Sequence, residues 1–220
     1  MNPGEFRLIV SSGPTREWID PVRFISNPSS GKTGWHLAAL GVERFQETCF
    51  VSGPGAPEYR AAEGARNIAV ESTQEMGESL ASLLREKSVL VMAAAPADYT
   101  PRSAPSKIKK KEAELVLHLQ PAMDILSTLK DRARELSSCY LVGFAAETEN
   151  LYENAYGKLK RKGLSFICAN QVYKTDRGFG ENDNEWLVIN EAGESRTLGP
   201  APKETLARAL LDQIIAELPG

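Results

Sequence analysis

The segment between residues 7 and 34 constrains the fold of this chain more than any other. It reads RLIVSSGPTREWIDPVRFISNPSSGKTG. The apolar run at residues 8–10 is typical of a short strand buried on both faces, and a glycine-bearing turn follows it directly. A second turn at residues 29–32 precedes an amphipathic helix that we expect over residues 34–45. Because the first N–H groups of a helix are unpaired and carry partial positive charge, this layout predicts a phosphate-binding site at the start of that helix.

Strand-like runs and helical patterns alternate along the rest of the chain. We expect strands at residues 8–11, 48–52, 67–70, 89–94, 140–144, 166–169 and 185–189, and helices at 34–45, 72–84, 124–136, 151–161 and 203–218. This alternation predicts the α/β class, with one Rossmann-like parallel sheet, helices on both faces and ligands at the carboxyl ends of the strands. A chain of 220 residues is within reach of a single core, so we expect one domain over residues 1–220.

Residues 99–119 break this alternation. They contain two prolines and a lysine run, and then residues 114–119 alternate between polar and apolar like an exposed strand. The segment is too long for a simple connection in an α/β unit, so we expect it to form a functional arm or flap.

Charge and cysteine content narrow the classes of partner. A net charge of −3 and a pI near 5.6 argue against nucleic-acid binding through a broad basic face. Cys49, Cys139 and Cys168 lie mostly in apolar runs, which is typical of buried thiols in a reducing compartment. The chain has no apolar stretch suited to a signal peptide or a membrane span, so we expect a cytoplasmic protein without a membrane partner. His36 and His118 lack metal-ligand spacing, and we expect no metal ligands on the protein.

Two known glycine motifs for nucleotide binding are incomplete here. A P-loop ending at the Gly31-Lys32-Thr33 sequence would need glycine at position 26, where this chain has Ser26. The full G-x-G-x-x-G pattern is also missing after Val10, which weakens a reductase dependent on NAD(P) or flavin. Ser29, Ser30 and Gly31 remain as phosphate-facing groups, with an ordinary helix cap as the alternative.

Three sequence blocks, in this order, resemble the phosphopantothenate-cysteine ligases (phosphopantothenoylcysteine synthetases). They are SGPTREWIDPVRFISNPSSGKTG, then AAAPADYTP followed by KIKKK, then GFAAETEN followed by KLKRKGL and CANQV. The resemblance extends from about residue 7 to about residue 215. It implies a bacterial CTP-dependent enzyme that ligates cysteine to 4'-phosphopantothenate in coenzyme A biosynthesis through an acyl-cytidylate, releasing pyrophosphate and CMP.

The resemblance also implies cofactors and partners. Mg²⁺ accompanies CTP, no flavin is used, and the active unit is a homodimer in which residues 99–119 cover the neighbour's site. Many relatives are fused to a flavin decarboxylase that we do not find in this sequence. A separate phosphopantothenoylcysteine decarboxylase is therefore a further candidate partner.

Three residues take roles near the chemistry by this resemblance. Asn27 is implied to contact the substrate carbonyl or the acyl-nucleotide, Arg23 to assist the cysteine-dependent second half, and Lys107 to contact the triphosphate. From the residues alone, Asn27-Pro28 is typical of a turn, and the lysine run is typical of a solvated face. Asn27 and Ala94 are the implied contacts to the acid substrate.

A larger set is implied to bind the nucleotide: Gly13, Ser29, Ser30, Gly31, Met92, Ala93, Ala94, Asp98, Lys107, Phe144, Lys158 and Lys162. Without the resemblance, Asp98 is equally suited to a turn or helix cap, Phe144 to the core, and the last two lysines to an exposed basic helix end. The chain departs from the family pattern at Ala122-Met123-Asp124-Ile125 and at Ser165. Two other functions stay open on the residues alone: a reductase of the same fold, and a nucleotide-binding protein without catalytic activity.

Overall fold

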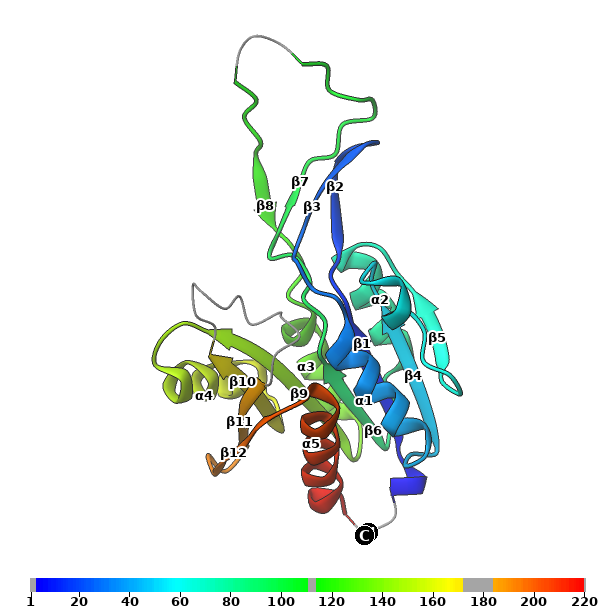
Figure 1. Cartoon of the computed structure of the whole chain (residues 1–220), viewed down its shortest axis with the longest axis vertical. Coiled ribbons are helices and arrows are strands. Elements are labelled where there is room, and N and C mark those ends of the chain that lie inside the picture. Colours follow the sequence, from blue (N-terminus) through cyan, green and yellow to red (C-terminus); the bar gives the residue numbers. More distant parts are fainter. Residues whose placement is uncertain (1–2, 111–113, 172–183, 220) are drawn as a thin grey trace.

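The computed structural model describes residues 3–110, 114–171 and 184–219. Its centre is an eight-stranded sheet (Figure 1). In spatial order the strands are β12 (Ser195–Ala201), β11 (Asn184–Asn190), β10 (Phe166–Gln171), β9 (Cys139–Glu147), β6 (Ser88–Met92), β1 (Arg7–Ser12), β4 (Glu47–Ser52) and β5 (Arg66–Ala69). Pairing is parallel from β10 to β5 and antiparallel for β11 and β12, so the predicted α/β sheet is confirmed with an antiparallel edge.

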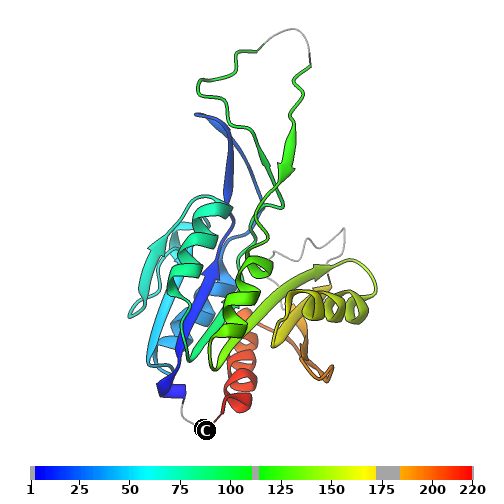
Figure 2. The same ribbon diagram turned by 180° about the vertical axis from the view of Figure 1, so that it is seen from behind.

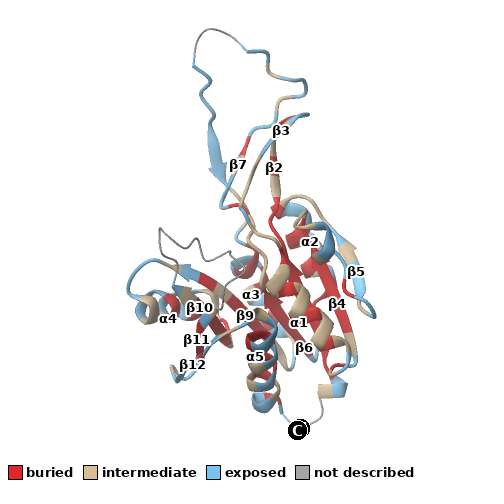
Figure 3. Ribbon diagram, in the orientation of Figure 1, coloured by how far each residue is buried: buried red, intermediate tan, exposed pale blue. Residues whose placement is uncertain are grey.

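Helices cover both faces of the sheet (Figures 1 and 2). One face carries α1 (Lys32–Val42) and α5 (Lys203–Glu217), and the other carries α2 (Thr73–Leu83), α3 (Ile125–Glu135) and α4 (Leu151–Lys162). Successive residues of β1 point to opposite faces: Leu8 and Val10 join the core under α1, and Ile9 joins the core under α2. Figure 3 shows the resulting buried band along the central strands. Two short 3₁₀ turns, η1 (Pro3–Glu5) and η2 (Pro57–Tyr59), lie outside it.

Helix α1 begins close to the end of β1 because glycines permit it. Gly31 caps the helix with φ of 87°, a backbone conformation that L side chains rarely adopt. A Cβ at Gly34 would lie 2.5 Å from Ser12 Oγ, so only glycine allows this approach. The α1 N-terminus therefore lies directly over the end of the central strand, as the sequence predicted.

A hairpin that the sequence analysis did not anticipate lies between β1 and α1. It consists of β2 (Arg16–Asp20) and β3 (Arg23–Ser26), where only turns were expected. Together with β7 (Tyr99–Pro101) and β8 (Leu119–Pro121), it projects from the carboxyl end of the sheet (Figure 1). The arm, residues 99–119, forms the long excursion that β7 and β8 enclose.

Several element predictions need correction. The strand predicted over residues 114–119 is wrong: residues 114–118 have no strand pairing, because β7 is only three residues long and pairs with residues 119–121. Strand β12 was missed, and α1 ends at Val42 rather than residue 45. The helix predicted over residues 72–84 is present as α2, and Ser72 caps it by accepting from Glu75 N at 3.2 Å through Oγ. Among the described helices, none combines the length and the apolar character that crossing a membrane requires.

Candidate active site

Two cavities lie at the carboxyl ends of β6 and β9. The first has a volume of about 330 Å³ and opens toward the start of α1, and the second, of about 400 Å³, opens toward α3 and α4. Four residues line both cavities: Ala94, Phe144, Ala145 and Ala146. Two ligands bound side by side would therefore meet at the ends of β6 and β9.

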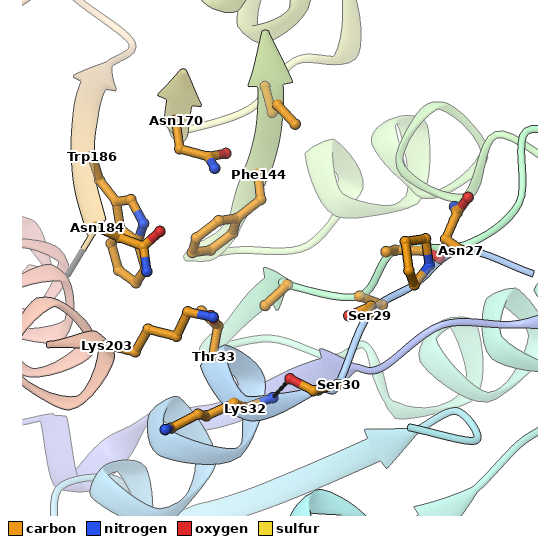
Figure 4. A pocket seen from close by; sticks show the side chains of 17 residues that line it. Asn27, Ser29, Ser30, Lys32, Thr33, Phe144, Asn170, Asn184, Trp186 and Lys203 are labelled. Carbon is orange, nitrogen blue, oxygen red and sulfur yellow. Dashed lines mark hydrogen bonds between the residues drawn. The ribbon is translucent and has the colours of Figure 1, made fainter. Parts of the chain in front are cut away.

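The first cavity is built on the N-terminus of α1 (Figure 4). Residues 29–33 line it, and the loop is held by Ser12 Oγ, which donates to Gly31 O at 2.7 Å, and by Ala56 N, which donates to Ser30 O at 2.9 Å. Lys32 adds a cation to this wall. Lys32 N donates to Ser30 Oγ at 3.3 Å, and the N–H groups of the next helical residues, with the hydroxyls and this ammonium, suit a phosphate group.

The opposite wall of the first cavity comes from β10, β11 and α5. Asn170, Asn184, Trp186 and Lys203 line it, and Trp186 packs edge-to-face on Phe144 with ring centroids 5.3 Å apart (Figure 4). The sequence analysis missed these four residues as ligand contacts. Asn170 lies within the CANQV block, which could have pointed to it, whereas the other three carry no local signal.

Asn27 lies at the end of the first cavity, with its orientation fixed by backbone. Its amide nitrogen donates to Ala95 O at 3.2 Å and to Pro96 O at 3.0 Å. Because two carbonyls face this nitrogen, the acceptor Oδ1 is the polar atom left for a ligand. A ligand that contacts Asn27 through Oδ1 would donate the hydrogen bond to it.

Two lysines of α4 reach the second cavity. Lys158 Nζ lies 2.5 Å from Glu147 Oε1, and Lys162 Nζ lies 3.0 Å from Asp124 Oδ1. Asp124 also caps α3 by accepting from Ser127 N at 3.2 Å. Burial opposes ionisation of the Asp124 carboxyl, but the hydrogen bonds from Lys162 and Ser127 outweigh it and hold the pKa below its usual 3.8. Both lysines are thus already paired with carboxylates before any ligand binds.

The other residues that line the second cavity are mainly apolar. Met92, Ala94, Met123 and Ile125 line it, and Asp98 lies at its edge. The stretch that departs from the family pattern, residues 122–125, therefore forms part of this wall and retains the helix-capping aspartate. The other departure, Ser165, lies at the opposite end of β10, at the start of the strand.

The structure gathers most of the predicted site residues but not three of them. Asn27, Ser29, Ser30, Gly31, Ala93 and Phe144 line the first cavity, and Met92, Ala94, Asp98, Phe144, Lys158 and Lys162 line the second. Gly13, Arg23 and Lys107 line neither cavity.

Each of these three residues has another place in the fold. Gly13 lies behind the wall, where its carbonyl accepts from Ala95 N at 2.9 Å. Arg23 belongs to the hairpin and forms an ion pair with Asp20. Lys107 lies exposed on the arm.

The thiols do not form part of either cavity. Cys49 and Cys168 are buried, and Cys139 is partly buried. Burial raises the pKa of the Cys139 thiol to about 11. Within the described ranges, no group of three His, Cys, Asp or Glu side chains is arranged to hold a metal ion.

Comparison with known proteins identifies a matching family and several relatives of this chain. The family described as DNA/pantothenate metabolism flavoprotein C-terminal domain matches residues 4–218. The coenzyme A biosynthesis bifunctional protein CoaBC of Bacillus subtilis is 35% identical over 210 residues, which cover 95% of this chain and 51% of that protein. The protein of the same name from Escherichia coli K12 is 36% identical over 218 residues, covering 94% and 51%. The chain thus spans about half the length of these curated relatives.

Solved structures agree with this placement. A crystal structure of the C-terminal domain of a CoaBC protein superposes with a TM-score of 0.78 at 34% identity, covering 97% of this chain and 96% of that chain. A Cab2 mutant, H337A, in complex with phosphopantothenate-cysteine shares the fold at a TM-score of 0.69 and 16% identity, covering 97% and 88%.

Proposed function

This chain belongs to the DNA/pantothenate metabolism flavoprotein C-terminal domain family, and on that premise we propose that it ligates cysteine to 4'-phosphopantothenate. The reaction consumes a nucleoside triphosphate, which we propose to be CTP, and serves coenzyme A biosynthesis. We propose that flavin plays no part in it. The single observation that supports the proposal best is the pair of cavities with a common wall at Ala94 and Phe144.

A ligase of this kind needs two anionic substrates to meet at one point. The first cavity suits the phosphorylated acid, because its wall combines a helix N-terminus with Ser29, Ser30 and Lys32, and these groups can bind a phosphate. The second cavity suits the nucleotide, because apolar side chains can pack on a base while Asp98, Lys158 and Lys162 supply polar contacts at the rim. This division differs from the sequence prediction, which assigned the α1 N-terminus to the nucleotide.

The first step forms the mixed anhydride at the common wall. A carboxylate oxygen of the acid attacks the α-phosphorus of CTP, the bond to pyrophosphate breaks, and the acyl-cytidylate remains. Both reactants approach over small residues, Ala94, Ala145 and Ala146, which leave room for two ligands. The protein contributes mainly by holding the reacting atoms together, which can lower a barrier by roughly 7–11 kcal/mol in favourable geometry.

The second step transfers the acyl group to cysteine. The cysteine nitrogen attacks the anhydride carbonyl, its C–O bond breaks, CMP leaves, and the nitrogen loses a proton. Asn27 Oδ1 lies free at the end of the first cavity and can accept a hydrogen bond from the incoming amine. The thiols of this chain take no part, because none of the three lines either cavity.

The proposed Mg²⁺ has no ligand set on the described part of the chain. Magnesium commonly binds through substrate phosphates with few protein ligands, so we propose that it enters with the triphosphate. The two reaction steps are therefore described in terms of the side chains of this protein and not of the metal ion.

We further propose a homodimer joined through the hairpin and the arm. Exposed apolar side chains gather on these projecting segments: Val22, Phe24, Tyr99, Leu115, Val116, Leu117 and Leu119. Exposed large apolar side chains on projecting segments favour an interaction surface there. A second copy would cover it and would carry Lys107 to the neighbour's cavities.

One assay tests the proposed function. Protein incubated with 4'-phosphopantothenate, cysteine, Mg²⁺ and CTP should release CMP and pyrophosphate in equal amounts and form phosphopantothenoylcysteine, detected by mass spectrometry. Without cysteine, pyrophosphate release should stop near one equivalent per site. ATP in place of CTP tests the nucleotide preference, and a separate decarboxylase, added second, should consume the product. Purified protein that carries bound NAD(P) or flavin and forms no product would favour the reductase instead.

A further inference from the structure

The side chain of Asp20 occupies a fully enclosed position at the tip of the β2–β3 hairpin. The residue has no exposed surface, and each carboxylate oxygen accepts more than one hydrogen bond. Oδ1 accepts from Val22 N at 2.9 Å and Arg23 N at 3.0 Å, and Oδ2 accepts from Arg23 Nε at 3.0 Å. Arg23 Nη2 also donates to Oδ2. A buried carboxylate with this many donors is a fixed structural centre rather than a mobile surface charge.

The same pair holds one residue of the arm by both of its backbone groups. Ile108 N donates to Asp20 Oδ2 at 3.1 Å, and Arg23 Nη2 donates to Ile108 O at 2.8 Å. A second contact lies four residues earlier, where Ala104 N donates to Ile19 O at 2.8 Å. In the described part of the arm after Ile108, residues 109–110 and 114–118 form no hydrogen bond. Along the described part of the arm that follows β7, Ile108 is therefore the last residue held by hydrogen bonds.

The hairpin that carries Asp20 and Arg23 is itself anchored in the body of the protein. Glu17 is buried, and its Oε1 accepts from Thr73 N at 2.9 Å and from Thr73 Oγ1 at 2.8 Å, at the start of α2. Thr15 Oγ1 accepts from Ala97 N at 3.0 Å, next to Asp98 of the second cavity. Hydrogen bonds therefore fix the base of the hairpin to α2 and to the loop after β6, while those of Asp20 and Arg23 fix its tip to Ile108.

We propose that Asp20 and Arg23 are positioning residues that clamp Ile108 and thereby set the place of the neighbouring Lys107. Lys107 precedes the clamped residue directly and is exposed. Arg23 then influences the reaction through the arm rather than by touching a substrate, which explains why it lines neither cavity. The catalytic consequence of the clamp rests on the proposed function, whereas the clamp itself does not.

Limited digestion by trypsin tests the clamp without any substrate. A protease must bind the chain in a locally opened form, so the Lys107–Ile108 bond should be cut slowly while Ile108 is held. Asp20→Asn removes the charge that unites these hydrogen bonds, and one charge-assisted bond is worth about 1.5–3 kcal/mol, so cleavage at this bond should accelerate at least about tenfold. Mass spectrometry identifies the cut bond. Glu71→Gln is the matched control, because it breaks the Arg16–Glu71 pair at the base of the same hairpin and should leave the rate unchanged.

A second variant keeps the inference open to contradiction if Asp20→Asn does not fold. Arg23→Lys retains the charge but cannot reach Asp20 and Ile108 O together, and it should also expose the bond. An unchanged cleavage rate in either folded variant would overturn the clamp, whatever the protein catalyses. In a ligase assay, Asp20→Asn should raise KM for CTP more than it lowers kcat, and its effect should not add to that of Lys107→Gln. Additive effects would return the pair to a purely structural role, and absence of ligase activity in the wild type would contradict only the proposed function.

Discussion

The amide nitrogen of Asn27 lies 3.0 Å from the carbonyl oxygen of Pro96, so the loop before α1 is tied to the loop after β6. This contact joins the two chain segments that flank the first cavity. A substitution at Asn27 therefore changes both the polar atom offered to a ligand and the fastening of the wall.

Asn27→Asp should abolish ligation while the protein remains folded. The carboxylate would face the carbonyl oxygens of Ala95 and Pro96 with no hydrogen to share, and it would bring negative charge to a site for anionic substrates. Loss of one preorganised polar group in an active site costs on the order of 10²-fold or more in rate. The measurement is product formation with circular dichroism as a folding check. Asn154→Asp on the surface of α4 makes the same chemical change and should be neutral; near-normal turnover of the Asn27 variant would refute its assignment.

Gly31→Ala should weaken both stability and binding of the phosphorylated acid. Its φ of 87° is unfavourable for alanine by about 1–2 kcal/mol, and the new Cβ would lie 3.2 Å from Ser12 Oγ. Urea unfolding and KM for 4'-phosphopantothenate measure the two effects. Gly157→Ala is the matched control, since no atom lies within 4 Å of a Cβ there, and it should stabilise α4 by about 0.5–1 kcal/mol. Equal behaviour of the two variants would contradict the role given to the α1 N-terminus.

The Asp124–Lys162 pair should contribute a pH-dependent part of the stability. The pKa of Asp124 is lower in the folded protein than its ordinary 3.8, so its contribution is present above that value and is lost as the pH falls through the lower, folded pKa. Both side chains are partly exposed, so the contribution is below about 1 kcal/mol. Urea unfolding of wild type and Asp124→Asn should differ at pH 7, and the difference should shrink as the pH falls through the folded pKa of Asp124. A difference that grows as the pH falls would contradict the sign of this pKa shift.

The thiols should prove dispensable. Burial raises the pKa of Cys139 to about 11 and that of Cys168 well above its usual value, so neither is a thiolate near neutral pH. The native protein should react slowly with a disulfide reagent at pH 8 and rapidly after unfolding. Cys139→Ala should retain ligase activity. A fast-reacting thiol whose blockage stops turnover would show that a cysteine has a role in the site after all.

Complementation tests the proposed dimer. Asn27→Asp and Lys107→Gln are each expected to be inactive, but in a dimer with crossed arms a mixed pair holds one intact site. Mixing equal amounts should restore about a quarter of the wild-type activity, because half of the dimers are mixed and each has one of two sites intact. Sedimentation gives the oligomeric state. A fully active monomer would rule out the arrangement, whereas a dimer that fails to complement would place both residues in one subunit's site.

The sequence predicted the central strands and the α1 N-terminus because those signals are local. Leu8 and Val10 form part of a continuous apolar run, and Gly31 marks the helix start. Strand β12 was missed because it is an edge strand with mostly exposed residues, so its sequence lacks the usual alternation of polar and apolar residues. It also contains the Gly199-Pro200 pair, which is uncommon in strands. The hairpin was missed because Pro21 interrupts two short runs.

The site residues that the sequence missed come together only through tertiary structure. Trp186 and Lys203 reach the first cavity because β11 and α5 return to the sheet beside β10 and α1, and nothing in their own neighbourhood reports this. Arg23 was placed near the chemistry by the family resemblance and not by any local signal. Its pairing with Asp20 across a tight turn depends on a hairpin that the pattern did not predict.

The shared wall at Phe144 has a thermodynamic consequence. Phe144 lines both cavities and its ring packs on Trp186, so a ligand that fixes this residue from one cavity also changes the surface that it offers to the other. Such coupling is reciprocal: if bound nucleotide changes the affinity for the acid by some factor, bound acid changes the affinity for the nucleotide by the same factor. Calorimetric titrations with the ligands added in either order should therefore give the same coupling free energy. Phe144→Leu should reduce this coupling free energy more than it reduces the affinity for either ligand measured alone.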